Sequence, residues 1–243
     1  MGQHGKHRPL VIWRAALFAT LALISGRADA DTCRLALVLA IDVSSSVDAQ
    51  EDQLQRQGLA TALLQDTVQA AILEGYGTVA INVFEWSGRR QQFGILPWTV
   101  LRSTKDIQDA ADAISGSTRQ VSVFPTSTGY ALGHAAILLD RGPVCDAKTI
   151  DFASDGRNND GFPPELAIRS FPLSDVTING LAILGDAPDL VTYFERSILH
   201  GPGAFVEIAN DYPDYARAME RKLLRELGTF VLGDALPPPT LTP

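Results

Sequence analysis

The sequence predicts an α/β fold in which a doubly wound, mostly parallel sheet carries one antiparallel edge strand. Apolar runs of strand length alternate with helix-length amphipathic segments from residue 34 to residue 227, which is typical of a sheet covered by helices on both faces. One pair of strand segments is joined by a short polar turn and therefore forms a hairpin. A chain of 243 residues, 46% of them hydrophobic, is long enough for one such core.

The predicted strands are short apolar or alternating runs bounded by turn residues. In chain order they cover residues 34–41, 78–86, 92–100, 149–153, 176–184 and 204–208. The first, RLALVLAI, is almost wholly apolar and ends at Asp42, as expected for a strand buried on both faces of a parallel sheet. Pro97 lacks an amide donor, so the third strand belongs at the sheet edge, antiparallel to the second across the turn at 87–90.

The predicted helices carry apolar residues at helical spacing. In chain order they cover residues 48–73, 104–114, 129–139, 164–170, 189–199 and 212–227. We expect an interruption of the first helix near Asp66, and Gly75 ends it. A loop rich in Ser and Thr, over residues 115–128, precedes the third helix. Because helices separate most of the strands, the connections are expected to cover both faces of one sheet.

The N-terminus has the pattern of a secretory signal peptide. Basic residues precede an apolar run over 15–24, and a small-residue pattern ends at Ala30, so we expect residues 1–30 to be removed by cleavage after Ala30. The apolar run has about half of the roughly 20 residues that a spanning helix needs. We therefore expect an exported protein, periplasmic or extracellular, without stable membrane insertion after cleavage.

Cleavage would leave one domain over residues 31–232 and a short tail over 233–243. The tail contains three consecutive prolines, cannot continue a helix and is expected to be disordered. The mature chain would keep 16 basic and 27 acidic side chains, a net charge of about −11 with neutral His. This balance argues against a nucleic-acid partner, because binding to phosphates requires a basic face.

Three loops carry oxygen-bearing side chains at the ends of predicted strands or before a predicted helix. Asp42, Ser44 and Ser46 form D-x-S-x-S after the first strand, Thr126 precedes the third helix, and Asp155 follows the fourth strand. In open sheets of this class, ligands bind outside the carboxyl ends of the strands. Hydroxyls and carboxylates are hard ligands that suit Mg²⁺, Mn²⁺ or Ca²⁺ and disfavour zinc or copper. Mg²⁺ suits hydroxyls on short side chains best.

These loops resemble the von Willebrand factor type A (VWA) domain and its metal-ion-dependent adhesion site (MIDAS). The family pattern is D-x-S-x-S, then T-x-T-G-x-A-L, then Asp-Gly, and the chain has all three in that order. The resemblance implies Ser44 and Ser46 as direct ligands, Thr126 as a direct or water-mediated ligand, and Asp42 and Asp155 as acceptors that hold coordinated waters. It also implies a Rossmann-like VWA fold over the domain.

The resemblance extends over nearly all of residues 33–230. The blocks IDVSSSVD, VFEWSG, PWT, DFASDGRNN, TINGLAIL, GPGAF and RKLLREL look like those of a bacterial exported VWA-like family of unknown function. One departure is the Phe124-Pro125 pair, where many VWA domains have Gly-Gly before the loop threonine. The stiffer approach leaves open whether Thr126 coordinates directly.

The two cysteines are spaced for a disulfide if the two aspartates lie level on adjacent strands. Cys33 lies nine residues before Asp42 and Cys145 ten before Asp155, so the cysteines would then lie level at the other end. Such a bond suits an oxidising exported compartment.

We expect a binding module whose metal captures an acidic group of a protein partner. A D-x-S-x-S string alone often only caps a helix, but its combination with Thr126 and Asp155 favours the metal. The alternatives are a metal-dependent hydrolase or an accessory subunit of an enzyme complex, and a metal that only stabilises the fold. His134 and His200 accompany no nucleophile motif, which weighs against an enzyme. The oligomeric state, the partner and the process stay open.

Overall fold

The computed structural model describes residues 1–2, 32–185, 187 and 189–228. The predicted signal peptide beyond residue 2 and the predicted tail over 233–243 lie outside these residues. The strands are β1 (Cys33–Asp42), β2 (Thr78–Trp86), β3 (Gln92–Leu101), β4 (Ala147–Ser154), β5 (Val176–Ile183) and β6 (Val206–Ala209). The helices are α1 (Ala49–Leu63), α2 (Asp66–Leu73), α3 (Thr104–Ser115), α4 (Thr128–Asp140), α5 (Pro164–Ser170), α6 (Leu190–Ser197) and α7 (Tyr215–Gly228).

The strands form one six-stranded sheet in the order β3-β2-β1-β4-β5-β6. All neighbouring pairs are parallel except β2 and β3, which are antiparallel, so the predicted edge hairpin is confirmed. The predicted break near Asp66 is also confirmed, since α1 ends at Leu63 and α2 begins at Asp66. The last helix begins at Tyr215 instead of residue 212, because the Asp214 amide donates to the Asp211 carboxylate and closes a turn.

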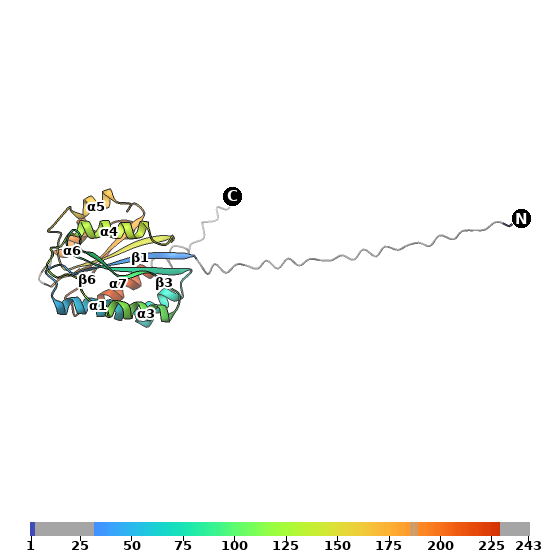
Figure 1. The fold of residues 1–243 in the computed structure, drawn as a ribbon, viewed down its shortest axis with the longest axis horizontal. Helices are drawn as coiled ribbons and strands as arrows, with labels where there is room; N and C mark the ends of the chain where they lie inside the picture. The colour runs from blue at the N-terminus through green and yellow to red at the C-terminus, as the bar shows by residue number, and fades with distance from the viewer. Residues whose placement is uncertain (3–31, 186, 188, 229–243) are drawn as a thin grey trace, which may run out of the picture.

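Two layers of helices cover the sheet, as Figure 1 shows. Helices α1, α2, α3 and α7 pack on one face, and α4, α5 and α6 pack on the other. Strand β1 alternates between the layers. Leu37 and Leu39 belong to the first core, while Ala36 and Ala40 belong to the second, where they leave room for α4. Burying one leucine side chain contributes about 1.5–3 kcal/mol, so β1 stabilises the domain from both faces.

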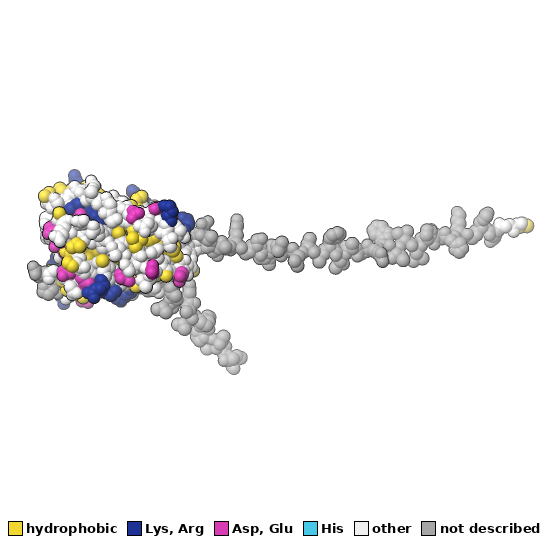
Figure 2. Space-filling view, turned by 90° about the horizontal axis from the view of Figure 1, so that it is seen from below, with side chains coloured by type: hydrophobic (Ala, Val, Ile, Leu, Met, Phe, Trp, Pro, Cys, Tyr) yellow, Lys and Arg dark blue, Asp and Glu magenta, His cyan; other side chains and the backbone are white. Residues whose placement is uncertain are grey.

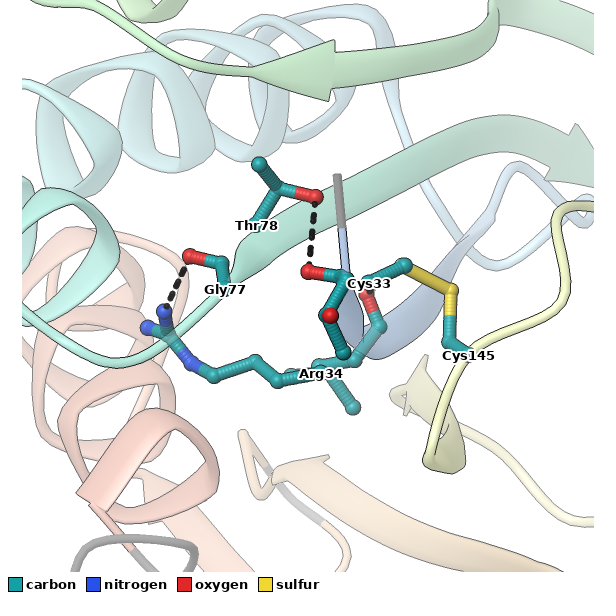
Figure 3. The surroundings of a disulfide bond; sticks show 7 residues. Cys33, Arg34, Gly77, Thr78 and Cys145 are labelled. Atoms are coloured by element: carbon teal, nitrogen blue, oxygen red, sulfur yellow. Dashed lines mark hydrogen bonds between the residues drawn. A yellow bond between two sulfur atoms is a disulfide. The ribbon is translucent and has the colours of Figure 1, made fainter. Parts of the chain in front are cut away.

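The predicted disulfide is present at the amino end of the sheet. Cys33 and Cys145 are bonded, with their Cα atoms 4.5 Å apart and a sequence separation of 112. Figure 3 shows the bond beside Arg34, whose guanidinium donates to the Gly77 carbonyl. Arg34 is 1% exposed and also donates to carbonyls of Ala71, Ile72 and Tyr76. The disulfide therefore joins β1 to the segment before β4, and Arg34 joins β1 to the end of α2.

A buried group of charged side chains lies between α7 and the sheet. The Lys222 ammonium is 2.8 Å from the Asp151 carboxylate and 2.6 Å from the Glu226 carboxylate. The Asn179 amide also donates to Glu226 at 2.9 Å. Burial raises the pKa of Glu226 to about 7 and raises the pKa of Asp151 as well, while Lys222 opposes both shifts. One proton shared by the two carboxyls would leave the group neutral.

Acidic and basic side chains are interspersed on the face that carries α1 and α3, as Figure 2 shows. No helix among the described residues is both long and apolar enough to cross a membrane.

Candidate metal centre

The three predicted loops meet at the carboxyl end of the sheet. Asp42 ends β1, Asp155 follows β4, and β1 and β4 are neighbours in the sheet. The connections of these two strands lead to opposite sides of the sheet, since β1 continues to β2 and β4 continues to β5. Thr126 enters from the loop before α4. The side chains therefore lie at the topological switch point, where folds of this class bind ligands.

The hydroxyls of these loops contact one another directly. The Ser44 and Ser46 Oγ atoms are 3.2 Å apart, and the Thr126 Oγ1 donates to Ser44 Oγ at 3.2 Å. The Ser46 hydroxyl donates to Asp155 Oδ1 at 2.9 Å. Four of the five predicted site residues thus form one chain of oxygen contacts.

The fifth predicted site residue, Asp42, lies beneath these oxygen contacts and is 0% exposed. Its Oδ1 accepts the Ser44 amide at 2.8 Å, and its Oδ2 accepts the Ser154 hydroxyl. Burial, and after it the negative charge of Asp155, raises the pKa of Asp42 to about 7. Burial and a neighbouring acid both destabilise the Asp42 carboxylate, and a cation held between the two acids would oppose this effect.

The donor set fits a small hard cation. Neighbouring ligands of an octahedral ion bound at about 2.1 Å lie about 3 Å apart, and the oxygen contacts here span 2.9–3.2 Å. Within the described part of the chain, no group of three or more His, Cys, Asp or Glu side chains is arranged to hold a metal. A site here would depend on three hydroxyls and two carboxylates.

A family model described as "Protein of unknown function (DUF1194)" matches residues 32–231. The chain belongs to this family. A comparison with curated proteins finds no match.

Solved structures show that this DUF1194 chain has the VWA fold. A von Willebrand factor type A protein from Catenulispora acidiphila is 20% identical with a TM-score of 0.57, over 81% of this chain and 43% of that one. Proximal thread matrix protein 1 from the mussel byssus, with a zinc-occupied MIDAS motif, is 18% identical with a TM-score of 0.55. That match covers 82% of this chain and 48% of the mussel chain. The pilus adhesin SpaC from Lactobacillus rhamnosus GG is 13% identical with a TM-score of 0.57, over 82% of this chain and 31% of the adhesin chain. This chain therefore spans less than half the length of each of these three.

One side chain that no sequence pattern identifies holds the D-x-S-x-S loop. Arg119 donates to the carbonyls of Val43 at 2.6 Å, Ser44 at 2.9 Å and Val47 at 2.8 Å. It also donates to the Val121 carbonyl within its own loop at 2.6 Å. One guanidinium thus ties the Ser/Thr-rich loop to the loop that carries the serines. An arginine in a polar loop has no pattern that reveals such contacts.

The Thr126 loop is also held by backbone contacts. The Ser45 amide donates to the Phe124 carbonyl at 2.8 Å, which fixes the segment before Pro125 against the first loop. The side-chain oxygen of Asn159 accepts the Thr126 backbone amide at 2.9 Å, and the backbone amide of Asn159 donates to the Thr126 carbonyl at 3.0 Å. Thr126 is therefore positioned from both sides in this DUF1194 member.

Asp48, His134 and His200 have structural roles. Asp48 caps α1, where its carboxylate and that of Glu51 form a reciprocal capping box. The His134 ring lies 4.8 Å from the Phe84 ring, and burial lowers its pKa. The His200 ring nitrogen lies 3.2 Å from the Leu173 carbonyl, far in the chain from the three loops.

Proposed function

We propose that this domain is an exported binding module that holds a divalent cation and uses it to capture an acidic group of a protein partner. The contact chain Thr126–Ser44–Ser46–Asp155 carries the proposal, because three hydroxyls and a carboxylate from three separate loops converge there. The VWA fold and the zinc-occupied MIDAS motif of the mussel protein support it.

In this proposal, Ser44, Ser46 and Thr126 provide the inner oxygens, and Asp42 and Asp155 hold coordinated water. We propose Mg²⁺, with Mn²⁺ or Ca²⁺ as alternatives, because none of the five residues offers a thiolate or an imidazole. When bound, the cation supplies a positive charge that attracts a carboxylate. Neutral hydroxyls leave most of that charge uncompensated, so a partner's acid can complete the coordination.

Export is part of the same proposal. The disulfide between Cys33 and Cys145 suits an oxidising compartment, and such bonds are rare where thiols are kept reduced. Pilus adhesins share the fold, so capture of a protein partner outside the cytoplasm fits the architecture.

Isothermal titration of residues 31–243 with MgCl₂ and MnCl₂ tests the site directly. We expect saturable binding of one ion, weakened at least about tenfold by Ser44→Ala. Ser45→Ala is the matched control, because Ser45 is an exposed serine between the two site residues and, within the described part of the chain, only its backbone amide makes a hydrogen bond.

A pull-down from a periplasmic or extracellular extract then tests the function. We expect a partner retained in Mg²⁺ and released by chelator, and lost with Ser44→Ala but not with Ser45→Ala. Well-folded protein that takes up neither Mg²⁺ nor Mn²⁺, or a partner that stays bound in chelator, would overturn the proposal.

A further inference from the structure

A pocket opens beside the candidate metal centre, with Asp155 as the residue that both share. Its volume is about 590 Å³, and it lies between the start of α1, the end of β5 and the segment before α7. Four of its lining residues are acids, namely Asp48, Glu51, Asp155 and Asp211. The described lining residues include no Lys or Arg.

The four carboxylates are held in place without neutralisation. Asp48 and Glu51 accept backbone amides in the capping box of α1, and Asp211 accepts the Asp214 amide at 2.9 Å. Asp155 accepts the Ser46 hydroxyl. Within the described part of the chain, none of the four forms an ion pair with Lys, Arg or His. Like charges fixed around one hollow attract a cation.

An aromatic side chain in the same pocket has an unused hydrogen-bonding group. Tyr212 lines the pocket and is 7% exposed, and its hydroxyl has no hydrogen-bond partner among the residues that the structure describes. A neutral phenol oxygen accepts a hydrogen bond, and the ring face attracts a cation.

We propose that this pocket receives a Lys or Arg side chain of the partner whose carboxylate reaches the metal centre. The inference rests on the proposed function and adds the partner's chemistry, namely an acid with a base beside it. Arg fits better than Lys, because its planar guanidinium donates five hydrogen bonds and stacks on aromatic rings. The Tyr212 oxygen and the four carboxylates are all acceptors that such a group can satisfy.

A random peptide library displayed on phage tests the pairing even while the partner is unidentified. Phage are bound to immobilised residues 31–243 in Mg²⁺ and eluted with chelator, and the eluted peptides are sequenced. We expect the eluted peptides to contain an acidic residue, with Arg or Lys enriched within about three residues of it. Three residues of extended chain span about 10 Å, which allows the acid to reach the metal centre while the base enters the pocket.

A selected peptide is then resynthesised with its base replaced by Gln and titrated against two protein variants. Glu51→Gln with Asp211→Asn keeps the hydrogen-bond acceptors and removes two charges from the pocket. Asp140→Asn with Asp175→Asn is the matched control, because both acids are exposed and lie near the other end of the sheet. We expect the peptide change alone, or the pocket variant alone, to weaken the affinity for the peptide about five- to tenfold. Combining the two changes should weaken the affinity little further, because both remove the same contact.

The outcomes separate the two proposals. Acidic peptides eluted by chelator but without enrichment of a base would overturn the inference and leave the metal-dependent function standing. Equal affinities of the pocket variant and the control variant for the selected peptide would do the same. A library that yields no chelator-sensitive peptide overturns both.

Discussion

Replacing Arg119 with alanine removes the guanidinium that ties the Ser/Thr-rich loop to the D-x-S-x-S loop. Three carbonyls of the serine-bearing loop, those of Val43, Ser44 and Val47, lose a charged donor at 2.6–2.9 Å. A hydrogen bond to a charged group contributes about 1.5–3 kcal/mol net. Arg119 is half-buried, so water replaces part of that loss. We expect a total cost of about 2–3 kcal/mol, which a domain with about 5–15 kcal/mol of stability survives.

The same loss is expected to appear in metal binding. A loop that is ordered only when the cation arrives uses part of the binding free energy for that ordering, and 2 kcal/mol corresponds to about a 30-fold weaker affinity. Residues that orient metal ligands commonly contribute about 10–100-fold when removed, which agrees with this magnitude.

Isothermal titration with Mn²⁺ and Mg²⁺ measures this affinity, and urea unfolding measures the stability. Arg141→Ala is the control, because Arg141 is an exposed arginine that follows α4 near the other end of the sheet. Arg119→Lys is expected to lose most of the affinity, since one ammonium cannot reach four carbonyls in the same geometry. An Arg119→Ala protein that binds the ion within about twofold of wild type would refute the positioning role.

Three further predictions concern stability. Reduction of the Cys33–Cys145 bond, which closes 112 residues, is expected to lower the free energy of unfolding by up to about 4–5 kcal/mol, measured by urea unfolding with and without reductant. The pKa of Glu226 is raised to about 7 by burial, so the folded state holds a proton that the unfolded state releases at lower pH. Stability should therefore fall as pH rises from about 5 to 7, by up to about 1.4 kcal/mol per unit, and Glu226→Gln should flatten the slope measured by unfolding at each pH. Gly129→Ala would place a Cβ 2.2 Å from the Phe162 carbonyl oxygen, whereas at Gly94 no described atom lies within 4 Å. We expect the first change to cost about 1–3 kcal/mol and the second less than about 1 kcal/mol in thermal unfolding, and equal costs would contradict the packing at α4.

The elements of the fold were predictable because their signals are local. The run before Asp42 is apolar on both sides, and in the structure its side chains enter both cores. Pro97 identified the edge strand, because a proline cannot complete a ladder between two neighbours. The ends of the elements moved by a few residues where capping decides them, as at Tyr215.

The candidate site was predictable for a different reason. Its five residues follow strand ends or precede a helix, and the parallel arrangement of β1 and β4 brings such positions to one edge. The residues that support the site follow no such pattern in the sequence. Arg119 stands in an irregular loop, and only the folded chain shows which carbonyls it meets.

The sequence by itself determined the alternation of strands and helices, the edge hairpin and the three oxygen-bearing loops, because each follows from short-range periodicity or spacing. The cysteine pairing depended in addition on β1 and β4 being neighbours, which the folded sheet decides. Only the tertiary structure decided that Tyr212 lies beside Asp155, and that Asp151 shares its burial with Lys222 and Glu226. Contacts between residues far apart in the chain depend on how helices pack against the sheet, and packing is a property of the whole core that no local pattern records.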